Sequence, residues 1–284
     1  MKIAFLGPEG SYSHLAAKAF LETESLKENA VNDWDECIPF RNFAEVLAAV
    51  KNGRVDGAAI PIENSLQGGV AQNLDLLQES EDLYAVKEYV LRIEHRLIYK
   101  EGTPLSQIGR VYSHRQALDQ CLGFLDKEMP FAALRETEST AFGIAKAMED
   151  ESGKSAAIAG MHTANLRGGF IVGEECISDE KNNFTHFLLI KKGKENLPKT
   201  SERVFFVAVC PHTKGSLVNL LQLIAKHDIN MTKIESRPVK NMPGEFRFFI
   251  EADCDIGQNA VQEMFAEIRK NTLECKLLGA YNRG

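Results

Sequence analysis

Four turns of this sequence place hydroxyl and amide side chains where an apolar strand pattern ends and a helical pattern begins. They lie at residues 7–14 (GPEGSYSH), 61–69 (PIENSLQGG), 113–116 (SHRQ) and 139–140 (ST). At such turns the helix N-terminus offers free N–H groups and a partial positive charge, which together favour an anion. We therefore expect the four turns to meet in one anion-binding pocket beyond the carboxyl ends of the strands.

The serines in these turns also have a simpler explanation. Ser11, Ser113 and Ser139 each precede a helical pattern and could act as N-caps, each contributing about 1 kcal/mol without any ligand. Capping and ligand binding are compatible, so both interpretations stay open. The glycines at positions 7, 10, 68 and 69 match neither GxGxxG nor GxxxxGK[ST], so we do not expect a nucleotide ligand.

A buried strand pattern at residues 182–187 (NNFTHF) carries a further candidate. Alternation along this strand puts Thr185 and Phe187 on one face and His186 on the other. A threonine in a strand is ordinary, so the residues alone leave Thr185 either as a strand former or as a reactive hydroxyl. Glu63 is equally open, since it could be an acid or base or an oriented structural carboxylate.

Other site chemistries find no support in the sequence. It contains no HExxH and no GxSxG motif. The six cysteines form no CxxC and have no histidine at metal-ligand spacing, so we expect no metal and reduced thiols in a reducing cytosol. Four histidines have no companion residue and are expected in core or surface roles: His95, His162, His212 and His227.

Composition narrows the class of protein. The 284 residues are 44% hydrophobic and 26% charged, which is typical of about two soluble globular domains. The net charge of −7 provides no basic surplus for a nucleic-acid partner. The apolar run at residues 3–6 is too short for a signal peptide, and no run approaches the ~20 residues of a membrane span. We therefore expect a cytoplasmic protein with no membrane partner.

The elements that position these turns follow an alternating pattern up to about residue 192. Strands are predicted at residues 2–6, 55–62, 110–112, 131–135 and 156–159, and helices at 13–23, 43–51, 114–127 and 140–149. This alternation is typical of parallel sheets with helices on both faces. Residues 84–99 and 184–190 are instead extended without a helix, and could link two lobes with a cleft between them. A single sheet with one long hairpin would give a similar pattern.

The remainder of the sequence has a different order. After a polar linker we predict strand 203–210, helix 215–227, strands 229–237 and 246–253, helix 259–271 and strand 274–280. This βαββαβ order is the ferredoxin-like arrangement. Because so small a sheet leaves one face and an edge uncovered, we expect it to dimerise.

Taken together, the motifs resemble one family, the prephenate dehydratases with a C-terminal ACT domain, over nearly the whole chain. The resemblance rests on the segments GPEGSYSH at 7–14, PIENSLQGGV at 61–70, SHRQALDQC at 113–121, ESTAFGIA at 138–145 and NNFTHF at 182–187. Two residues depart from the family pattern: Arg115 replaces the usual proline and His186 the usual arginine. In the C-terminal part GSLV at 215–218 is similar to the family's GALV, with Ser216 for alanine, and ESRP at 235–238 is identical.

The resemblance implies a fold and a domain organisation. The expected fold is α/β, with two lobes like type II periplasmic binding proteins and the active site in their cleft, followed by a ferredoxin-like ACT domain. The expected boundaries are 1–192 for the catalytic region, 193–202 for the linker and 203–284 for the ACT domain. Because the first predicted strand begins at residue 2, we expect the monofunctional form without a preceding chorismate mutase.

The resemblance also implies the reaction. Prephenate loses CO2 and water to give phenylpyruvate in phenylalanine biosynthesis, with L-phenylalanine as feedback effector. Aromatisation drives this reaction, so no cofactor is expected. A homodimer or homotetramer formed through the ACT and catalytic domains is expected.

Residue roles follow by matching motif positions. The family's catalytic positions correspond to Thr185, Glu63, Asn64, Ser113 and Gln120. Substrate contacts are expected from Ser11, Ser13, Ser65, Ser139, Thr140 and His186. The phenylalanine site, at the interface of paired ACT domains, is expected from Gly215, Ser216, Leu217, Val218, Glu235, Ser236, Arg237 and Pro238.

Two alternatives remain at this point. A closely related enzyme could prefer arogenate, the transaminated substrate, and form phenylalanine directly. From a different class, a two-lobed protein with an ACT domain could be a non-catalytic sensor of a small molecule.

Overall fold

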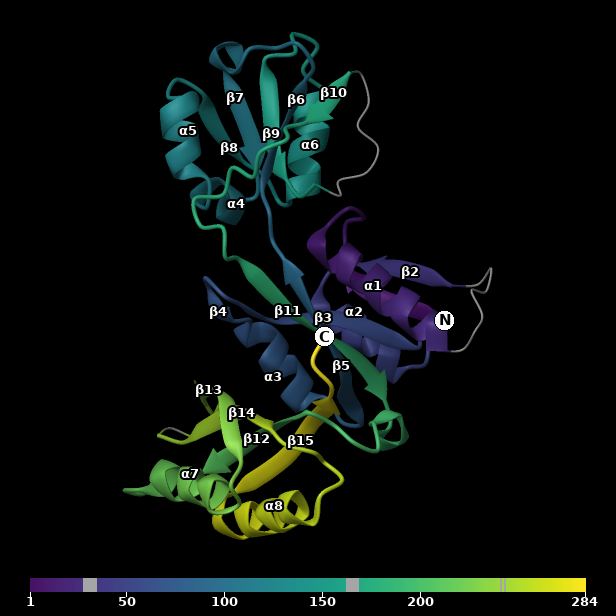
Figure 1. Cartoon of the computed structure of the whole chain (residues 1–284), viewed down its shortest axis with the longest axis vertical. Helices are drawn as coiled ribbons and strands as arrows, with labels where there is room; N and C mark the ends of the chain where they lie inside the picture. The colour runs from purple at the N-terminus through teal and green to yellow at the C-terminus, as the bar shows by residue number, and fades with distance from the viewer. Residues whose placement is uncertain (28–34, 162–168, 241, 243) are drawn as a thin grey trace.

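The computed structural model describes residues 1–27, 35–161, 169–240, 242 and 244–284. Its strands form two sheets, one of ten strands in the order β13-β14-β12-β15-β5-β11-β3-β1-β2, with β4 beside β3, and one of five strands in the order β10-β6-β9-β7-β8. In Figure 1 the smaller sheet forms an upper lobe, which two strands of the larger sheet approach from below. The two-lobed α/β architecture agrees with the expectation from the sequence.

The first lobe holds the N-terminal strands and three helices. Its elements are β1 (Lys2–Leu6), α1 (Tyr12–Lys27), β2 (Glu36–Phe40), α2 (Phe43–Lys51), β3 (Gly57–Asn64), β4 (Gly68–Gly69), α3 (Ala71–Glu79), β5 (Leu83–Arg92) and β11 (Phe184–Lys192). Strand β1 lies parallel to β2 and β3, whereas β11 runs antiparallel between β3 and β5. Helix α2 shows how local sequence sets these bounds, because Asn42 accepts from the backbone N–H of Glu45, and Glu45 reaches back to the N–H of Arg41.

The second lobe is built on the five-stranded sheet. Its elements are β6 (Arg96–Lys100), η1 (Leu105–Gln107), β7 (Arg110–Ser113), α4 (Arg115–Asp119), α5 (Leu122–Glu128), β8 (Ala133–Glu136), α6 (Thr140–Met148), β9 (Ser155–Ala159) and β10 (Phe170–Val172). Buried clusters lie on both faces, one around Val111, Leu118 and Ile158 and the other around Ile98, Ile144 and Ala157. Helices on both faces agree with the alternation of strands and helices. The sheet is mixed rather than parallel as expected, since β7 pairs in parallel with β8 and β9 but β6 pairs antiparallel with β9 and β10.

Two crossing segments, residues 93–95 and 173–183, connect the lobes. The predicted extended stretch at 84–99 is therefore two strands in different sheets, and the alternative of one long hairpin is wrong. The segments bind one another, since Ile93 N–H donates to Asn183 O at 2.8 Å and Ile177 N–H donates to His95 O at 2.9 Å. They form a two-stranded hinge, which is where a cleft would open and close.

The predicted helix at 114–127 is wrong in one respect. The structure divides it into α4 and α5, because the backbone of Cys121, with φ of −125° and ψ of 12°, departs from helical geometry. Gln120 ends α4, and its backbone carbonyl accepts from the N–H of Asp179 on the second crossing segment, at 2.8 Å. The break therefore holds Gln120 beside the hinge.

The C-terminal unit has the predicted order of elements. They are η2 (Lys194–Asn196), β12 (Arg203–Cys210), α7 (Ser216–Lys226), β13 (Asn230–Pro238), β14 (Phe246–Asp253), α8 (Asn259–Asn271) and β15 (Glu274–Tyr281). From β12 to β15 the chain has the βαββαβ order, with both helices packed on one face of the sheet against Phe206, Ile250 and their neighbours. The unit lies below the first lobe in Figure 1.

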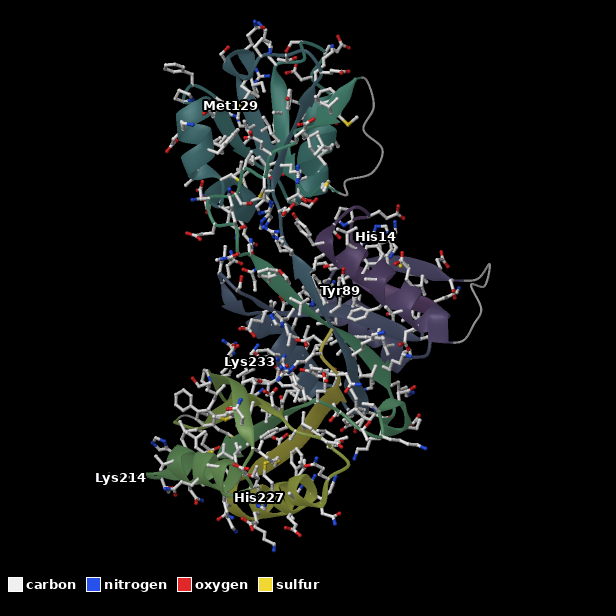
Figure 2. All side chains as sticks on the ribbon, viewed as in Figure 1. His14, Tyr89, Met129, Lys214, His227 and Lys233 are labelled. Carbon is white, nitrogen blue, oxygen red and sulfur yellow. The ribbon has the colours of Figure 1, made fainter. Side chains whose placement is uncertain are left out.

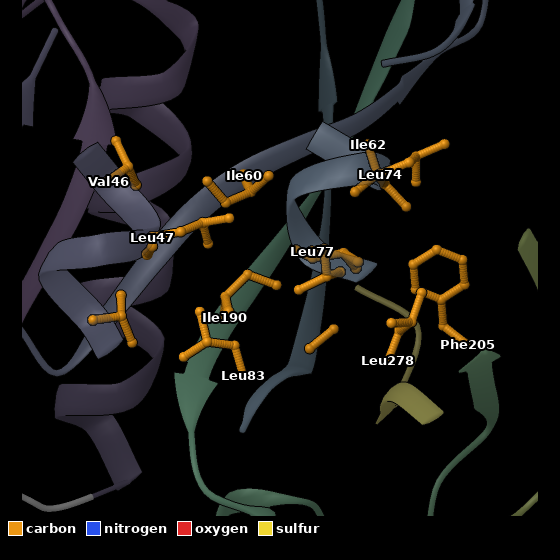
Figure 3. Close-up of a cluster of buried hydrophobic side chains, with 14 of the residues drawn as sticks. Val46, Leu47, Ile60, Ile62, Leu74, Leu77, Leu83, Ile190, Phe205 and Leu278 are labelled. Atoms are coloured by element: carbon orange, nitrogen blue, oxygen red, sulfur yellow. The ribbon is translucent and has the colours of Figure 1, made fainter. Parts of the chain in front are cut away.

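The C-terminal unit does not stand apart from the first lobe. Strand β15 pairs with β5 at Gly279 and Ala85, where a Cβ on residue 279 would lie 2.5 Å from the Cβ of Ala85, so glycine permits the approach. One buried cluster extends from Ile60, Leu74 and Ile190 of the first lobe to Phe205 and Leu278 of the C-terminal unit (Figure 3). The two parts share a core, which the sequence pattern did not predict.

The cysteines and the helix lengths can also be compared with the expectations from the sequence. All six cysteines are free thiols. Within the described residues, no helix is long and apolar enough to cross a membrane.

Candidate active site

A cavity of about 340 Å³ lies between the lobes, within the size range of small-molecule sites. Its walls come from the ends of β1 and β3 and the start of β11 in the first lobe, and from the starts of α4 and α6 in the second. Six of the residues expected in the site line it: Ser11, Ser13, Asn64, Ser139, Thr140 and Thr185. The structure therefore brings all four sequence turns to one cleft, although the turn after β7 contributes His114 and Gln116 rather than Ser113.

Two helix N-termini open toward this cavity. Ser139 caps α6 by accepting from Phe142 N–H at 3.1 Å, and Ser11 accepts from His14 N–H at 3.3 Å in the turn that begins α1. Among the described residues that line the cavity, none is arginine or lysine. Backbone N–H groups and helix dipoles contribute positive potential there, which suits a carboxylate.

Thr185 and Asn64 are paired at the floor of the cavity. The amide Nδ2 of Asn64 donates to Thr185 Oγ1 at 3.0 Å, because β3 and β11 are in register at these two residues. The Oδ1 of Asn64 accepts from the backbone N–H groups of Leu66 and Gln67 at 3.1 and 3.2 Å. The amide nitrogen of Asn64 must therefore face Thr185, which leaves the hydroxyl hydrogen of Thr185 free for a ligand.

Gln120 stands one step away from the cavity. Its Oε1 accepts from Asn183 Nδ2 at 3.0 Å and lies 2.8 Å from His95 Nε2. Asn183 in turn accepts at Oδ1 from Asn64 at 2.7 Å. We call these five residues, His95, Gln120, Asn183, Asn64 and Thr185, the hinge network.

Three other expected site residues do not line the cavity. Ser113 is fully buried and donates to Ile158 O at 2.6 Å, so it is not the expected N-cap; His114 caps α4 instead. Ser65 is exposed and exchanges hydrogen bonds with Asn182 O and Phe184 N–H, which fasten β3 to β11. Glu63 pairs with Lys233 of the C-terminal unit at 2.8 Å.

His186 lies on the opposite face of β11 from the cavity. The expected substrate contact of His186 does not fit this geometry, because alternation along the strand directs Thr185 and Phe187 to the cavity and His186 away from it. Its Nδ1 donates to Glu88 Oε1 at 2.9 Å, and the same carboxylate oxygen accepts from Arg203 at 3.1 Å. His186 is not among the described residues that line this cavity.

The charges around Glu88 explain the ionisation of this pair. The hydrogen bond to Glu88 raises the pKa of His186, although burial opposes the change. Burial alone would raise the pKa of Glu88, which is 2% exposed, but the hydrogen bond from His186 and the charge of Arg203 outweigh it and leave that pKa below its usual value. Both pKa shifts favour the charged form of the pair, which holds β11 and β5 to β12.

The two expected effector motifs lie apart in the described chain. Ser216 and Leu217 line a cavity of about 140 Å³ next to Phe246, while Gly215 starts α7 with φ of +84° and Val218 is exposed. On β13, Ser236 and Pro238 are exposed, whereas Glu235 and Arg237 turn toward the first lobe. There Arg237 pairs with Asp75 at 3.2 Å, and the Glu235 carboxylate lies against Gly69.

Several residues at the site were missed by the sequence analysis. Tyr12, Gln67, His95 and Glu138 line the cavity, and buried Asn183 links Asn64 to Gln120. Asn183 lies within the motif NNFTHF and could have been found there. His95 has no neighbouring signal in the sequence. Of the other histidines without a companion, His162 lies outside the described residues.

Comparisons with known proteins agree with this geometry. The family model for prephenate dehydratase matches residues 3–195. A bifunctional chorismate mutase/prephenate dehydratase of Escherichia coli is 32% identical over 283 residues, which cover 99% of this chain and 70% of that protein.

Two solved structures are similar over the whole chain. A prephenate dehydratase of Arthrobacter aurescens in complex with L-Phe has 29% identity and a TM-score of 0.85, covering 100% of this chain and 90% of that one. One from Staphylococcus aureus has 27% identity and a TM-score of 0.80, covering 99% and 100%. The family model over residues 3–195 and the 32% identity to the Escherichia coli protein show that this chain belongs to the prephenate dehydratase family.

Proposed function

We propose that this protein is a lyase that converts prephenate to phenylpyruvate in phenylalanine biosynthesis. The observation that carries the proposal is the Thr185 hydroxyl at the floor of the cleft. Its oxygen accepts from Asn64, so its hydrogen can be donated to the substrate. The reaction is inferred from the family, and the position of the substrate hydroxyl is inferred from the place of Thr185 in the cavity.

The reaction needs a hydrogen-bond donor at one atom. In prephenate the C–C bond to the ring carboxylate breaks to release CO2, and its electron pair enters the ring. The C–O bond to the ring hydroxyl breaks at the same time, and the departing oxygen takes up one proton, supplied in the end by the solvent, to leave as water. Thr185 would donate to that oxygen, and because threonine is a weak acid, its positioning matters more than its acidity.

Each of the two negatively charged carboxylates of prephenate needs an anchor with positive potential. The N-termini of α1 and α6 provide these anchors through Ser11, Ser13, Ser139 and Thr140, which line the same cavity from opposite lobes. A substrate held at both N-termini would draw the lobes together. We propose that closure of the cleft places the ring hydroxyl against Thr185.

We also propose an effector function for the C-terminal unit. Its βαββαβ order and its GSLV and ESRP motifs support an ACT domain at residues 203–284, after a catalytic region at 1–192 and a linker at 193–202. Among the described residues, Ser216 and Leu217 line a pocket to which no residue of ESRP contributes. A phenylalanine site made of both motifs would therefore use a second copy, as a dimer or tetramer would supply. We propose dehydratase activity for the two lobes and effector binding for this unit.

A turnover assay tests the proposed function. Purified protein with prephenate, without added metal or cofactor, is expected to form phenylpyruvate and CO2 in equal amounts, well above the rate without protein. Arogenate assayed alongside is expected to react more slowly. Faster turnover of arogenate, or binding of prephenate without product, would contradict the proposal and favour an arogenate enzyme or a sensor.

A further inference from the structure

The donor and the acceptor of every hydrogen bond in the hinge network can be deduced, starting from the bonds that Asn64 makes to the backbone. The backbone N–H groups of Leu66 and Gln67 can only donate, so the atom of Asn64 that they contact is its oxygen. The amide nitrogen of Asn64 then faces Asn183, which must present its own oxygen. Asn183 therefore presents its nitrogen to Gln120, and Gln120 accepts through Oε1.

This direction fixes the tautomer of His95. The Gln120 oxygen that accepts from Asn183 lies 2.8 Å from His95 Nε2. Because an oxygen without a hydrogen can only accept, Nε2 must carry the proton and donate. The neutral ring then has a bare Nδ1, which is buried and has no hydrogen-bond partner in the described part of the chain.

His95 is held neutral by its surroundings. The residue is 4% exposed, and burial lowers its pKa, although the hydrogen bond to Gln120 opposes the change. Its ring packs edge-on against Tyr12, which is fixed by a hydrogen bond to Glu94 O at 2.7 Å. A proton added at Nδ1 would be buried without an acceptor, which is unfavourable.

The network reaches Thr185 through the amide nitrogen of Asn64, which has fewer hydrogens than nearby acceptors. Asn64 Nδ2 has two hydrogens and three acceptors: Asn183 Oδ1 at 2.7 Å, Thr185 Oγ1 at 3.0 Å and Phe184 O at 3.2 Å. One hydrogen is directed to Thr185 only while Asn183 holds the other. Asn183 is itself fully buried and keeps its orientation while Gln120 accepts from it.

We propose that His95 is a positioning residue for the reaction: by donating to Gln120 it holds Asn183 and Asn64 in the arrangement that leaves the Thr185 hydroxyl hydrogen free for the substrate. The inference rests on the proposed function. It also gives the hinge a role, because His95 and Asn183 lie on the two crossing segments, Gln120 on the second lobe, and Asn64 and Thr185 on the first. The donor at Thr185 is thus set by contacts that span both lobes.

Two substitutions at one position separate donation from packing. His95→Gln keeps an N–H donor at the ε position, whereas His95→Met has similar length and no donor. We expect His95→Met to lower kcat by at least about tenfold with KM changed less than about threefold, since one lost positioning hydrogen bond has effects of this order. His95→Gln is expected to recover most of kcat.

Other outcomes would overturn the inference. Equal loss in both variants would mean a packing role, an effect on KM alone would mean direct substrate contact, and normal kcat in His95→Met would mean no role. In a Gln120→Met background, His95→Met is expected to cause no further loss; additive losses would contradict the network. Failure of the unsubstituted protein to convert prephenate would instead refute the proposed function.

A spectroscopic measurement covers the case in which a variant does not fold. In unsubstituted protein with 15N-labelled histidine, the resonances of His95 at pH 7 are expected to show a protonated Nε2 and an unprotonated Nδ1. A proton on Nδ1 at that pH would reverse the deduced direction and overturn the inference without any activity assay.

Discussion

At the scale of single residues, position 186 shows how a family motif can mislead about contact. The motif places His186 where the family has arginine, and this match predicted a substrate contact. A strand sends neighbours to opposite faces, so His186 reaches Glu88 and Arg203 while Thr185 reaches the cavity. The face of each residue was predictable from the sequence, whereas the identity of the partner was not, because Glu88 lies 98 residues away.

The His186–Glu88 pair predicts a pH dependence of stability. The pKa of His186 is raised in the folded protein, so its contribution is fully present below the unfolded value of about 6.5 and is lost as pH rises through the folded value. The lowered pKa of Glu88 has the opposite sign, so its contribution is lost as pH falls through its folded value. Glu63, Glu251 and Arg203 also face the pair.

Urea unfolding at several pH values measures this contribution. Between pH 6 and pH 9 the unsubstituted protein is expected to lose more free energy of unfolding than His186→Gln, which keeps a hydrogen bond without a titrating proton. Parallel losses in the two proteins would contradict a charged His186–Glu88 pair.

At the scale of elements, the sequence predicted the helices and strands that have a clear local pattern of apolar and polar residues. The strands at 2–6, 203–210 and 246–253 and the helices at 43–51 and 259–271 were predicted with the bounds that the structure has. Helix α3 was missed because its N-cap, Val70, makes no side-chain cap bond. Strand β2 was missed because it is a short edge strand that contains Pro39.

Two helix caps give a matched test of the anion pocket. Ser139 caps α6 at the cavity and Asn42 caps α2 away from it, each with one side-chain bond to a backbone N–H. Replacing either by alanine is expected to lower stability by about 1 kcal/mol. Only Ser139→Ala is expected to raise the KM for prephenate. Equal KM values in the two variants would contradict a carboxylate site at the start of α6.

At the scale of the whole molecule, the unforeseen feature is the docking of the C-terminal unit on the first lobe. Lys233 lies at this junction in Figure 2, and pairs with Glu63, the neighbour of Asn64 on β3. Glu235 and Arg237 on the same strand contact the first lobe at Gly69 and Asp75. Contacts between residues so distant in sequence produce no periodic pattern of apolar residues. The sequence therefore predicted the fold of the C-terminal unit but not its docking on the first lobe.

We expect the contacts at this junction to couple phenylalanine binding at the proposed effector site to turnover in the cleft. Lys233→Met is expected to reduce the effect of L-phenylalanine on turnover by about fivefold or more, the lower range of allosteric coupling. Lys240→Met is the control, because Lys240 makes a more exposed pair with Glu79 across the same junction, and such pairs contribute little. Titration of the rate with phenylalanine measures both. An equal response in the two variants would contradict coupling through Lys233.

The most direct test of the proposed activity is the hydroxyl of Thr185. Thr185→Ala is expected to lower kcat for prephenate by about 100-fold or more, as removal of a preorganised donor does. Thr185→Ser, which keeps the hydroxyl, is expected to retain most of the rate. Thr23→Ala, which removes an exposed hydroxyl bonded to Ala19 O, is expected to leave it unchanged. Near-normal turnover by a folded Thr185→Ala protein would contradict the account.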